Sequence, residues 1–178
     1  MRKSKKFYYL LGLFAGDGWF QSRGISIGTK YSKRAIEIAL LMASVFDGTP
    51  IIKRRIYDDG HKMYLVSFYS VKLENIFRSL LGNPPHDKSK TFQIPRFASA
   101  KFKRAFIKGL FDAESYEYIW RGAPRIGMEI FNPRAAEFIR EELNRDGVRC
   151  SLSHCSDGGC RLDVTGVSNV DHFHFLYD

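Results

Sequence analysis

Two short segments of this 178-residue chain repeat one another almost position by position. One reads LLGLFAGDG and begins at Leu10; the other reads IKGLFDAES and begins at Ile107. Each segment is largely apolar and has an acid, Asp17 or Glu114, at its second-last position. Two copies of so unusual a segment predict two like halves that form one body.

The spacing of small residues predicts that both segments form helices that touch. Gly12 and Gly16 lie one helical turn apart in the first segment, and Gly109 and Ala113 hold the same places in the second. A glycine inside a helix costs up to about 1 kcal/mol relative to alanine, so its presence in both copies indicates a contact that a side chain would block. Each apolar run is far shorter than the ~20 residues that cross a bilayer.

The two acids predict a metal site. If the helices pair about a local twofold axis, Asp17 and Glu114 meet at one end, where each helix already carries a partial negative charge. Two like charges at close range favour the capture of a cation. Hard oxygen ligands suit Mg²⁺, which keeps waters and completes its shell with phosphate. A core helix pair whose acids only cap backbone amides is the simpler alternative.

The two segments resemble the motif of the LAGLIDADG homing endonucleases, in the single-chain form that has two copies. The first copy matches at both glycines and at the acid Asp17; the second has Glu114 as its acid and departs at Ser115, where the family usually has glycine. The resemblance implies a metal-dependent endonuclease that cuts both strands of a long DNA site across the minor groove and leaves short 3′ overhangs. It implies Mg²⁺, with Mn²⁺ as a substitute, held by Asp17 and Glu114 with Gly16 and Ala113 beside them.

The composition agrees with a nucleic-acid partner and excludes other classes. A net charge of +9 favours a polyanion. Hydrophobic residues make up 44% and aromatic residues 15% of the chain, which excludes disorder. The apolar segment after the basic start has no small-residue cleavage site of a signal peptide. We therefore expect an intracellular monomer, in the cytoplasm or in a eukaryotic organelle, that does not enter a membrane.

The hydrophobic periodicity behind each motif predicts the same series of elements twice. We expect an α+β fold with pseudo-twofold duplicated αββαββα halves, in which the two motif helices form the interface. The first half covers residues 1–81, a connector covers 82–98, and the second half covers 99–178.

Two local features of the first half are predicted from composition. Residues 1–6 read as a basic tail whose lysines can reach phosphates. Ser32 is expected to cap a helix over residues 33–46. Its inward stripe should include Ile36 and Leu40.

Each half should form a four-stranded antiparallel sheet with one face under helices and one face free. Two free faces around a twofold axis form a saddle for duplex DNA. Arginine and lysine bond guanine in the major groove, glutamine bonds adenine, and carboxylates accept from cytosine. The candidate residues are Gln21, Arg23, Ser26, Lys30, Lys53, Arg55 and Tyr57 in the first half, and Tyr118, Arg121, Arg125, Glu129, Arg149, Ser151, Ser153, Arg161, Asp163 and Thr165 in the second. Since the two sets differ, the DNA site should be non-palindromic. A solvated sheet face is the plain alternative.

A third catalytic group is implied by the resemblance. Family members often have a pocket lysine after the first hairpin, and Lys72 opens the predicted helix there, with Lys30 as a weaker candidate. The counterpart in the second half is Asn169 or Ser168, which has no charge. The two DNA strands would then be cut at unequal rates.

The three cysteines do not form a familiar metal pattern. Cys150, Cys155 and Cys160 lie five residues apart with His154 among them, whereas zinc sites usually pair cysteines two to four residues apart. We expect reduced thiols. A bridge between Cys155 and Cys160 stays open for a thermophilic source.

Two other classes of function stay open. The first is an RNA maturase or a non-cleaving DNA-binding regulator on the same fold, and the intact acids of both motifs favour the enzyme over it. The second is a ribonucleoprotein adaptor, which should expose stacking aromatics on a sheet. The phenylalanines of this chain fall instead in helical stripes and core positions.

Overall fold

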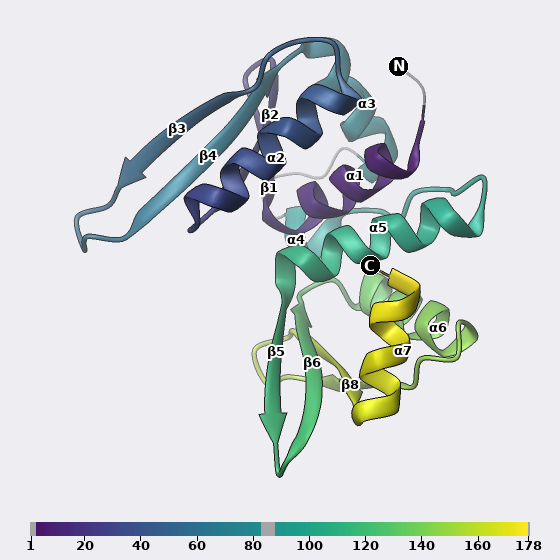
Figure 1. Ribbon diagram of the computed structural model, residues 1–178. Helices are drawn as coiled ribbons and strands as arrows, with labels where there is room; N and C mark the ends of the chain where they lie inside the picture. The colour runs from purple at the N-terminus through teal and green to yellow at the C-terminus, as the bar shows by residue number, and fades with distance from the viewer. Residues whose placement is uncertain (1–2, 83–87, 178) are drawn as a thin grey trace.

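The computed structural model describes residues 3–82 and 88–177 and shows two halves built from the same series of elements (Figure 1). The first half contains α1 (Lys5–Asp17), β1 (Gly18–Gln21), β2 (Gly24–Thr29), α2 (Ser32–Val45), β3 (Ile51–Ile56), β4 (Lys62–Tyr69) and α3 (Val71–Leu81). After the short helix α4 (Lys88–Thr91), the second half contains α5 (Ala100–Glu114), β5 (Ser115–Trp120), β6 (Ala123–Ile130), α6 (Pro133–Arg145), β7 (Cys150–His154), β8 (Cys160–Thr165) and α7 (Val167–Tyr177). The predicted αββαββα series is confirmed in both halves.

The predicted connector contains one element that the sequence did not indicate. Helix α4 lies within it, and Phe92, directly after α4, is buried in the core. Residues 83–87, which include the two prolines expected to mark the connector, lie outside the described residues.

The two sheets have the same topology, and the first strand of each sheet starts directly after the acid of its motif. Their strand orders are β1-β2-β4-β3 and β5-β6-β8-β7, and all pairs are antiparallel. Gly18, which follows Asp17, pairs with Ile27, while Ser115, which follows Glu114, pairs with Met128. Positions in one sheet can therefore be matched to positions in the other by register.

Helices cover one face of each sheet and complete a shared core. Ile25 and Ile27 on β2 are fully buried, and Ile126 and Met128 on β6 are buried in the same way. One continuous cluster of buried side chains includes residues of both halves. Because burial of apolar surface is the main favourable term in folding, the halves stabilise each other.

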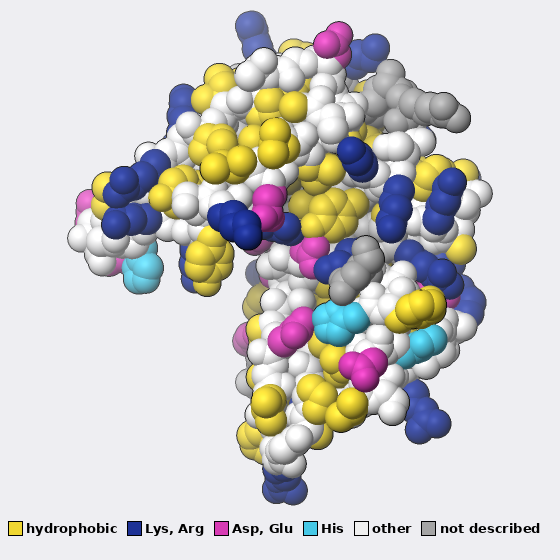
Figure 2. Space-filling view, viewed as in Figure 1, with side chains coloured by type: hydrophobic (Ala, Val, Ile, Leu, Met, Phe, Trp, Pro, Cys, Tyr) yellow, Lys and Arg dark blue, Asp and Glu magenta, His cyan; other side chains and the backbone are white. Residues whose placement is uncertain are grey.

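The other face of each sheet borders an open concavity. In Figure 1 the β3–β4 hairpin and the β5–β6 hairpin project from the α1–α5 pair and leave a space between them. In Figure 2 the outline of the molecule is hollowed at this place; lysine and arginine side chains gather on the upper arm, and on the lower arm they show only at the tip. This is the shape predicted for the saddle, and we use that name for it below.

Helix α2 faces the core with a different stripe from the one predicted. Its buried residues are Ala35, Ile38 and Met42. Ile36 and Leu40 are 54% and 67% exposed, so the prediction that they point inward was wrong. The small Ala35 lets this stripe pack on the sheet, and the helix is rotated accordingly. Ser32 is the first residue of α2 and not its cap.

Helix α1 starts earlier than expected. Ser4 is its N-cap, and the Ser4 hydroxyl accepts a hydrogen bond from the Phe7 amide at 3.2 Å. Lys5 and Lys6 therefore belong to the helix and not to a basic tail, of which residues 1–2 lie outside the described residues. In the described part of the chain, no helix combines the length and the hydropathy that a bilayer span needs.

The cysteine cluster forms part of the second-half sheet. All three thiols are free, and Cys150 and Cys160 are buried. Burial raises the pKa of the Cys150 thiol to about 12. The Cys160 sulfur lies 3.5 Å from Nδ1 of His154.

Candidate catalytic centre and nucleic-acid interface

Helices α1 and α5 pack backbone against backbone at their glycines. A Cβ added to Gly12 would lie 2.1 Å from the carbonyl oxygen of Phe106, and a Cβ added to Gly109 would lie 2.1 Å from the carbonyl oxygen of Tyr9. Each of these carbonyls lies three residues before the glycine of its own helix, so the two contacts are related by a twofold axis. No side chain fits at either glycine, which explains why both motifs have one there.

The same symmetry brings the two acidic ends together. Asp17 and Glu114 are the last residues of α1 and α5. A Cβ added to Gly16 would lie 2.6 Å from Cβ of Ala113 and 3.1 Å from Oε1 of Glu114. The Glu114 carboxylate therefore lies against the turn that ends in Asp17. Asp17 is exposed and Glu114 is half-buried.

A hollow of about 250 Å³ extends from Glu114 along the second-half sheet. Gly16, Glu114, Tyr116 and Glu129 are among the residues that line it. The Tyr116 hydroxyl donates a hydrogen bond to Oε1 of Glu129 at 3.4 Å. Glu129, predicted to read bases, thus shares a hollow with the acid of the second motif. The sequence analysis missed Tyr116, although its place two residues after Glu114 was a usable signal.

The two acids fit the divalent metal that the resemblance implies. Both offer hard oxygen ligands, and they lie at the end of the helix pair from which β1 and β5 start (Figure 1). In residues 3–82 and 88–177, no three His, Cys, Asp or Glu side chains group closely enough to hold an ion by themselves. Such a donor set suits Mg²⁺, which takes few protein ligands and uses water and phosphate for the rest.

The two lysines proposed as catalytic belong to the first half, one after β2 and one at the start of α3. Lys72, the second residue of α3, lines a separate hollow together with Asp47 and Ser70. Lys30 is exposed just after β2. Neither lysine lines the hollow beside Glu114.

Most predicted contact residues of the first half are accessible, but Ser26 is not. The exposed ones are Arg23, Lys30, Lys53, Arg55 and Tyr57. Ser26 is fully buried, so the prediction that it contacts DNA was wrong. Its Oγ lies 2.7 Å from Oγ of Ser67, which accepts a hydrogen bond from Nε2 of Gln21 at 3.0 Å. Ser26 therefore does not reach solvent. It contacts Ser67, and Ser67 in turn positions the side chain of Gln21.

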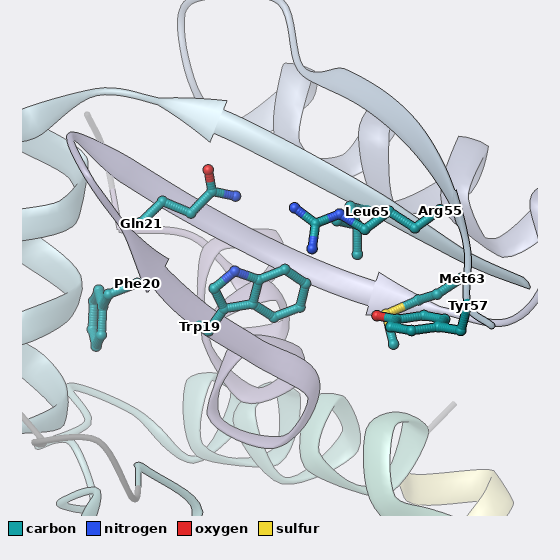
Figure 3. Close-up of a pocket in the computed structure, with 7 residues that line it drawn as sticks. All are labelled: Trp19, Phe20, Gln21, Arg55, Tyr57, Met63 and Leu65. Carbon is teal, nitrogen blue, oxygen red and sulfur yellow. The ribbon is translucent and has the colours of Figure 1, made fainter. Parts of the chain in front are cut away.

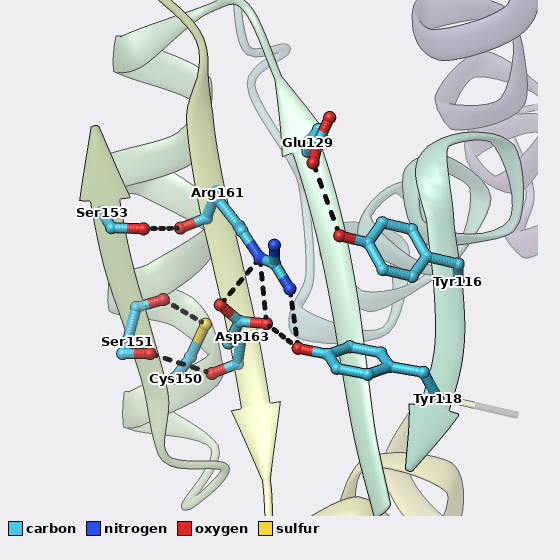
Figure 4. Close-up of polar contacts among 8 residues, drawn as sticks. All are labelled: Tyr116, Tyr118, Glu129, Cys150, Ser151, Ser153, Arg161 and Asp163. Atoms are coloured by element: carbon cyan, nitrogen blue, oxygen red, sulfur yellow. Dashed lines mark hydrogen bonds and ion pairs between the residues drawn. The ribbon is translucent and has the colours of Figure 1, made fainter. Parts of the chain in front are cut away.

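In the second half, the predicted residues at the centre of the sheet bind one another (Figure 4). The Arg161 guanidinium donates to the Tyr118 hydroxyl at 2.7 Å and lies 3.1 Å from Oδ2 of Asp163. The Tyr118 hydroxyl in turn donates to Oδ1 of Asp163 at 2.9 Å. Arg125 is half-buried, and the exposed candidates are Arg121, Glu129, Arg149, Ser151, Ser153 and Thr165.

Both sheet faces that border the saddle have aromatic side chains. Alternation along the strands places Trp19 and Tyr57 on this face of the first sheet, and Tyr116, Tyr118 and Trp120 on that of the second. The sequence analysis placed only the phenylalanines in helical stripes and the core, and it did not name Trp19, Tyr116 or Trp120 as contact residues. The period-two pattern of β5 was the available signal.

Comparisons with known proteins find the fold but no sequence relative. No family profile matches the sequence, and no curated protein matches it. A mesophilic variant of the homing endonuclease I-DmoI has a TM-score of 0.70 at 22% identity, over 97% of this chain and 95% of that one. I-DmoI in complex with DNA and Mn has a TM-score of 0.68 at 21% identity, over 98% and 97%. The N-terminal LAGLIDADG domain of DUF199/WhiA has a TM-score of 0.67 at 15% identity, over 98% and 84%. The chain therefore has the single-chain, two-motif LAGLIDADG fold.

Proposed function

We propose that the protein is a metal-dependent, site-specific DNA endonuclease of the homing type. The observation that supports this most directly is the place of Glu114, whose carboxylate lies against the turn ending in Asp17. A duplex bound in the saddle would present phosphates of both strands to this pair of acids. The similar fold of I-DmoI, solved in complex with DNA and Mn, is consistent with the proposal.

The chain's own residues would hold and orient the reacting groups. When bound, divalent ions supply an activated water and neutralise the charge that develops on the phosphate. Asp17 and Glu114 would bind these ions, one acid from each half. The partial negative charge at the two helix C-termini strengthens cation binding there. Because Gly12 and Gly109 fix the helix packing, the acids are positioned before DNA binds.

The finer details of the proposal are inferred from the two motifs and from the unlike sheets. One chain has both motifs, so a monomer would cut both strands across the minor groove and leave short 3′ overhangs. Equivalent positions on the two sheets differ, as Ser67 and Asp163 do. Unlike faces suit a long non-palindromic site, because only identical faces require a palindrome.

Selection of cleaved products from a random duplex library tests this function. With Mg²⁺ or Mn²⁺, we expect one long non-palindromic sequence with short 3′ overhangs to be enriched. Ca²⁺ serves as a control for binding. Stable binding of duplex DNA in Ca²⁺ with no cleaved sequence enriched in Mg²⁺ or Mn²⁺ would contradict the endonuclease.

The alternative is an RNA maturase or a non-cleaving DNA-binding regulator on the same fold. The aromatic side chains beside the saddle favour it, because tyrosine and tryptophan stack on unpaired bases. Binding of labelled RNA in preference to duplex DNA, with no cleavage of either, would support the maturase. Binding of duplex DNA alone, without cleavage, would support the regulator.

A further inference from the structure

Equivalent places on the two sheets are filled differently. Leu65 pairs with Gly28 in the first sheet, and Arg161 pairs with Glu129 in the second. Since the registers are equal, Leu65 and Arg161 hold the same position. In the second sheet, the planar guanidinium of Arg161 lies 5.7 and 5.6 Å from the centres of two tyrosine rings. In the first sheet, the shorter Leu65 leaves a hollow of about 480 Å³.

The walls of this hollow, which we call the Trp19 hollow, are aromatic and apolar (Figure 3). Trp19 and Tyr57 lie on opposite sides of it, with Leu65 beside Arg55 and Met63 beside Tyr57. The indole packs closely over Gly28, where an added Cβ would lie 3.3 Å from Cζ3 of Trp19 and would push the ring outward. The hollow therefore presents a broad aromatic surface to a flat group.

Two polar side chains border the Trp19 hollow. The amide of Gln21 and the guanidinium of Arg55 point toward each other above the indole (Figure 3). Arg55 is exposed, and among the described residues no side-chain hydrogen bond or ion pair engages it. Lys53, on the same face of β3, adds a second exposed positive charge. A planar ligand with hydrogen-bonding edges and a nearby negative charge would match all of these groups.

We propose that the Trp19 hollow binds one unpaired nucleobase of a nucleic acid that lies on the first sheet. The base would take the place that the Arg161 guanidinium takes in the second sheet, stacked on Trp19 with Arg55 and Gln21 at its edges. A base inside a duplex is covered on both faces by its neighbours, so the occupant must be unpaired or turned out of the helix. The inference rests on the proposed function only in that the sheet binds nucleic acid.

The fluorescence of Trp19 gives a direct readout. The chain has two tryptophans, so Trp120→Phe leaves Trp19 as the single emitter. The probes are a DNA hairpin with one unpaired thymine and the fully paired hairpin, both titrated with Ca²⁺ present so that no cutting is needed. We expect the unpaired thymine to quench Trp19 and to bind about tenfold more tightly, as one stacked base gives. The same pair of hairpins made of RNA, with uracil in place of thymine, tests whether the hollow binds an unpaired base of RNA as well as of DNA.

Two substitutions at one position provide a matched comparison. Leu65→Arg should fill the Trp19 hollow with the group of the second sheet and abolish the preference for the unpaired thymine. Leu65→Met should keep the hollow open and preserve the preference. Equal binding of both hairpins with no quenching, or a preference that survives in Leu65→Arg, would overturn the inference but not the endonuclease. Failure to bind either hairpin, with binding of the selected duplex retained, would likewise overturn the inference, whereas loss of binding to the selected duplex as well would contradict the proposed function.

Discussion

Gly12 and Gly109 face each other's helices in the same way, since a Cβ on either would come within 2.1 Å of a carbonyl oxygen of the other helix. These two equivalent contacts lie about the twofold axis that relates the halves. The places of Asp17 and Glu114 follow from it, because each acid lies five residues after its glycine. The glycines thereby set the geometry of the proposed catalytic centre.

Alanine at either glycine is predicted to destabilise the protein. Gly12→Ala and Gly109→Ala should each lower the free energy of unfolding by about 1–3 kcal/mol, because the added methyl overlaps backbone. Helix propensity alone predicts the opposite sign, a gain of up to about 1 kcal/mol. Denaturant unfolding measures the difference, and a stabilised variant would show that the helices do not touch here.

Asp112 is predicted to have a structural role, unlike Glu114 two residues later. Its carboxylate accepts a hydrogen bond from the Tyr9 hydroxyl at 2.5 Å and lies 2.5 and 3.5 Å from Lys108 and Arg34. Asp112→Asn should lower the free energy of unfolding by about 1–3 kcal/mol, as expected for lost bonds to charged groups. The variant should still cut DNA. A folded variant without cleavage would instead place Asp112 in the catalytic centre.

Acid sensitivity is predicted to depend on Asp146. Hydrogen bonds from Arg104, at 2.8 Å to each carboxylate oxygen, are the main cause that lowers the pKa of Asp146, and the Tyr177 hydroxyl contributes at 2.7 Å. The folded state favours the ionised carboxylate, so its stabilisation is complete above the ordinary aspartate pKa and is lost as the pH falls below about 4.

The measurement is the free energy of unfolding of the wild type and of Asp146→Asn across this range of pH. The wild type should be more stable at neutral pH, and the difference should shrink as the pH falls. A difference that stays constant would show that protonation of Asp146 does not cause the loss of stability at low pH.

Lys72→Ala tests the lysine proposed from the resemblance. Because Lys72 lines a hollow with Asp47 and Ser70 and not the hollow beside Glu114, we expect unchanged single-turnover rates for both strands. Slower nicking of one strand with unchanged DNA affinity would show that the lysine reaches the reacting phosphate.

The sequence predicts local features better than contacts between strands. Repetition of the motif was enough to predict the packing at Gly12 and Gly109, since both copies obey the same constraint. The burial of Ser26 and the partnership of Arg161 with Tyr118 depend on which strand pairs with which. Single strands show only which residues alternate, so those contacts were missed. Helix α2 was misjudged because two apolar stripes fit its sequence.

The most direct test of the central claim compares cleavage and binding in Asp17→Asn and Glu114→Gln, with Glu117→Gln as the control. Glu117 is an exposed carboxylate three residues after Glu114 that lies 3.4 Å from His174, so its loss removes charge without touching the proposed centre. With a selected duplex, we predict that both motif variants bind at least as tightly as the wild type in Ca²⁺ and do not cut in Mg²⁺, while the control cuts normally. Cleavage by either motif variant, or loss of binding together with cutting in a folded protein, would contradict the account.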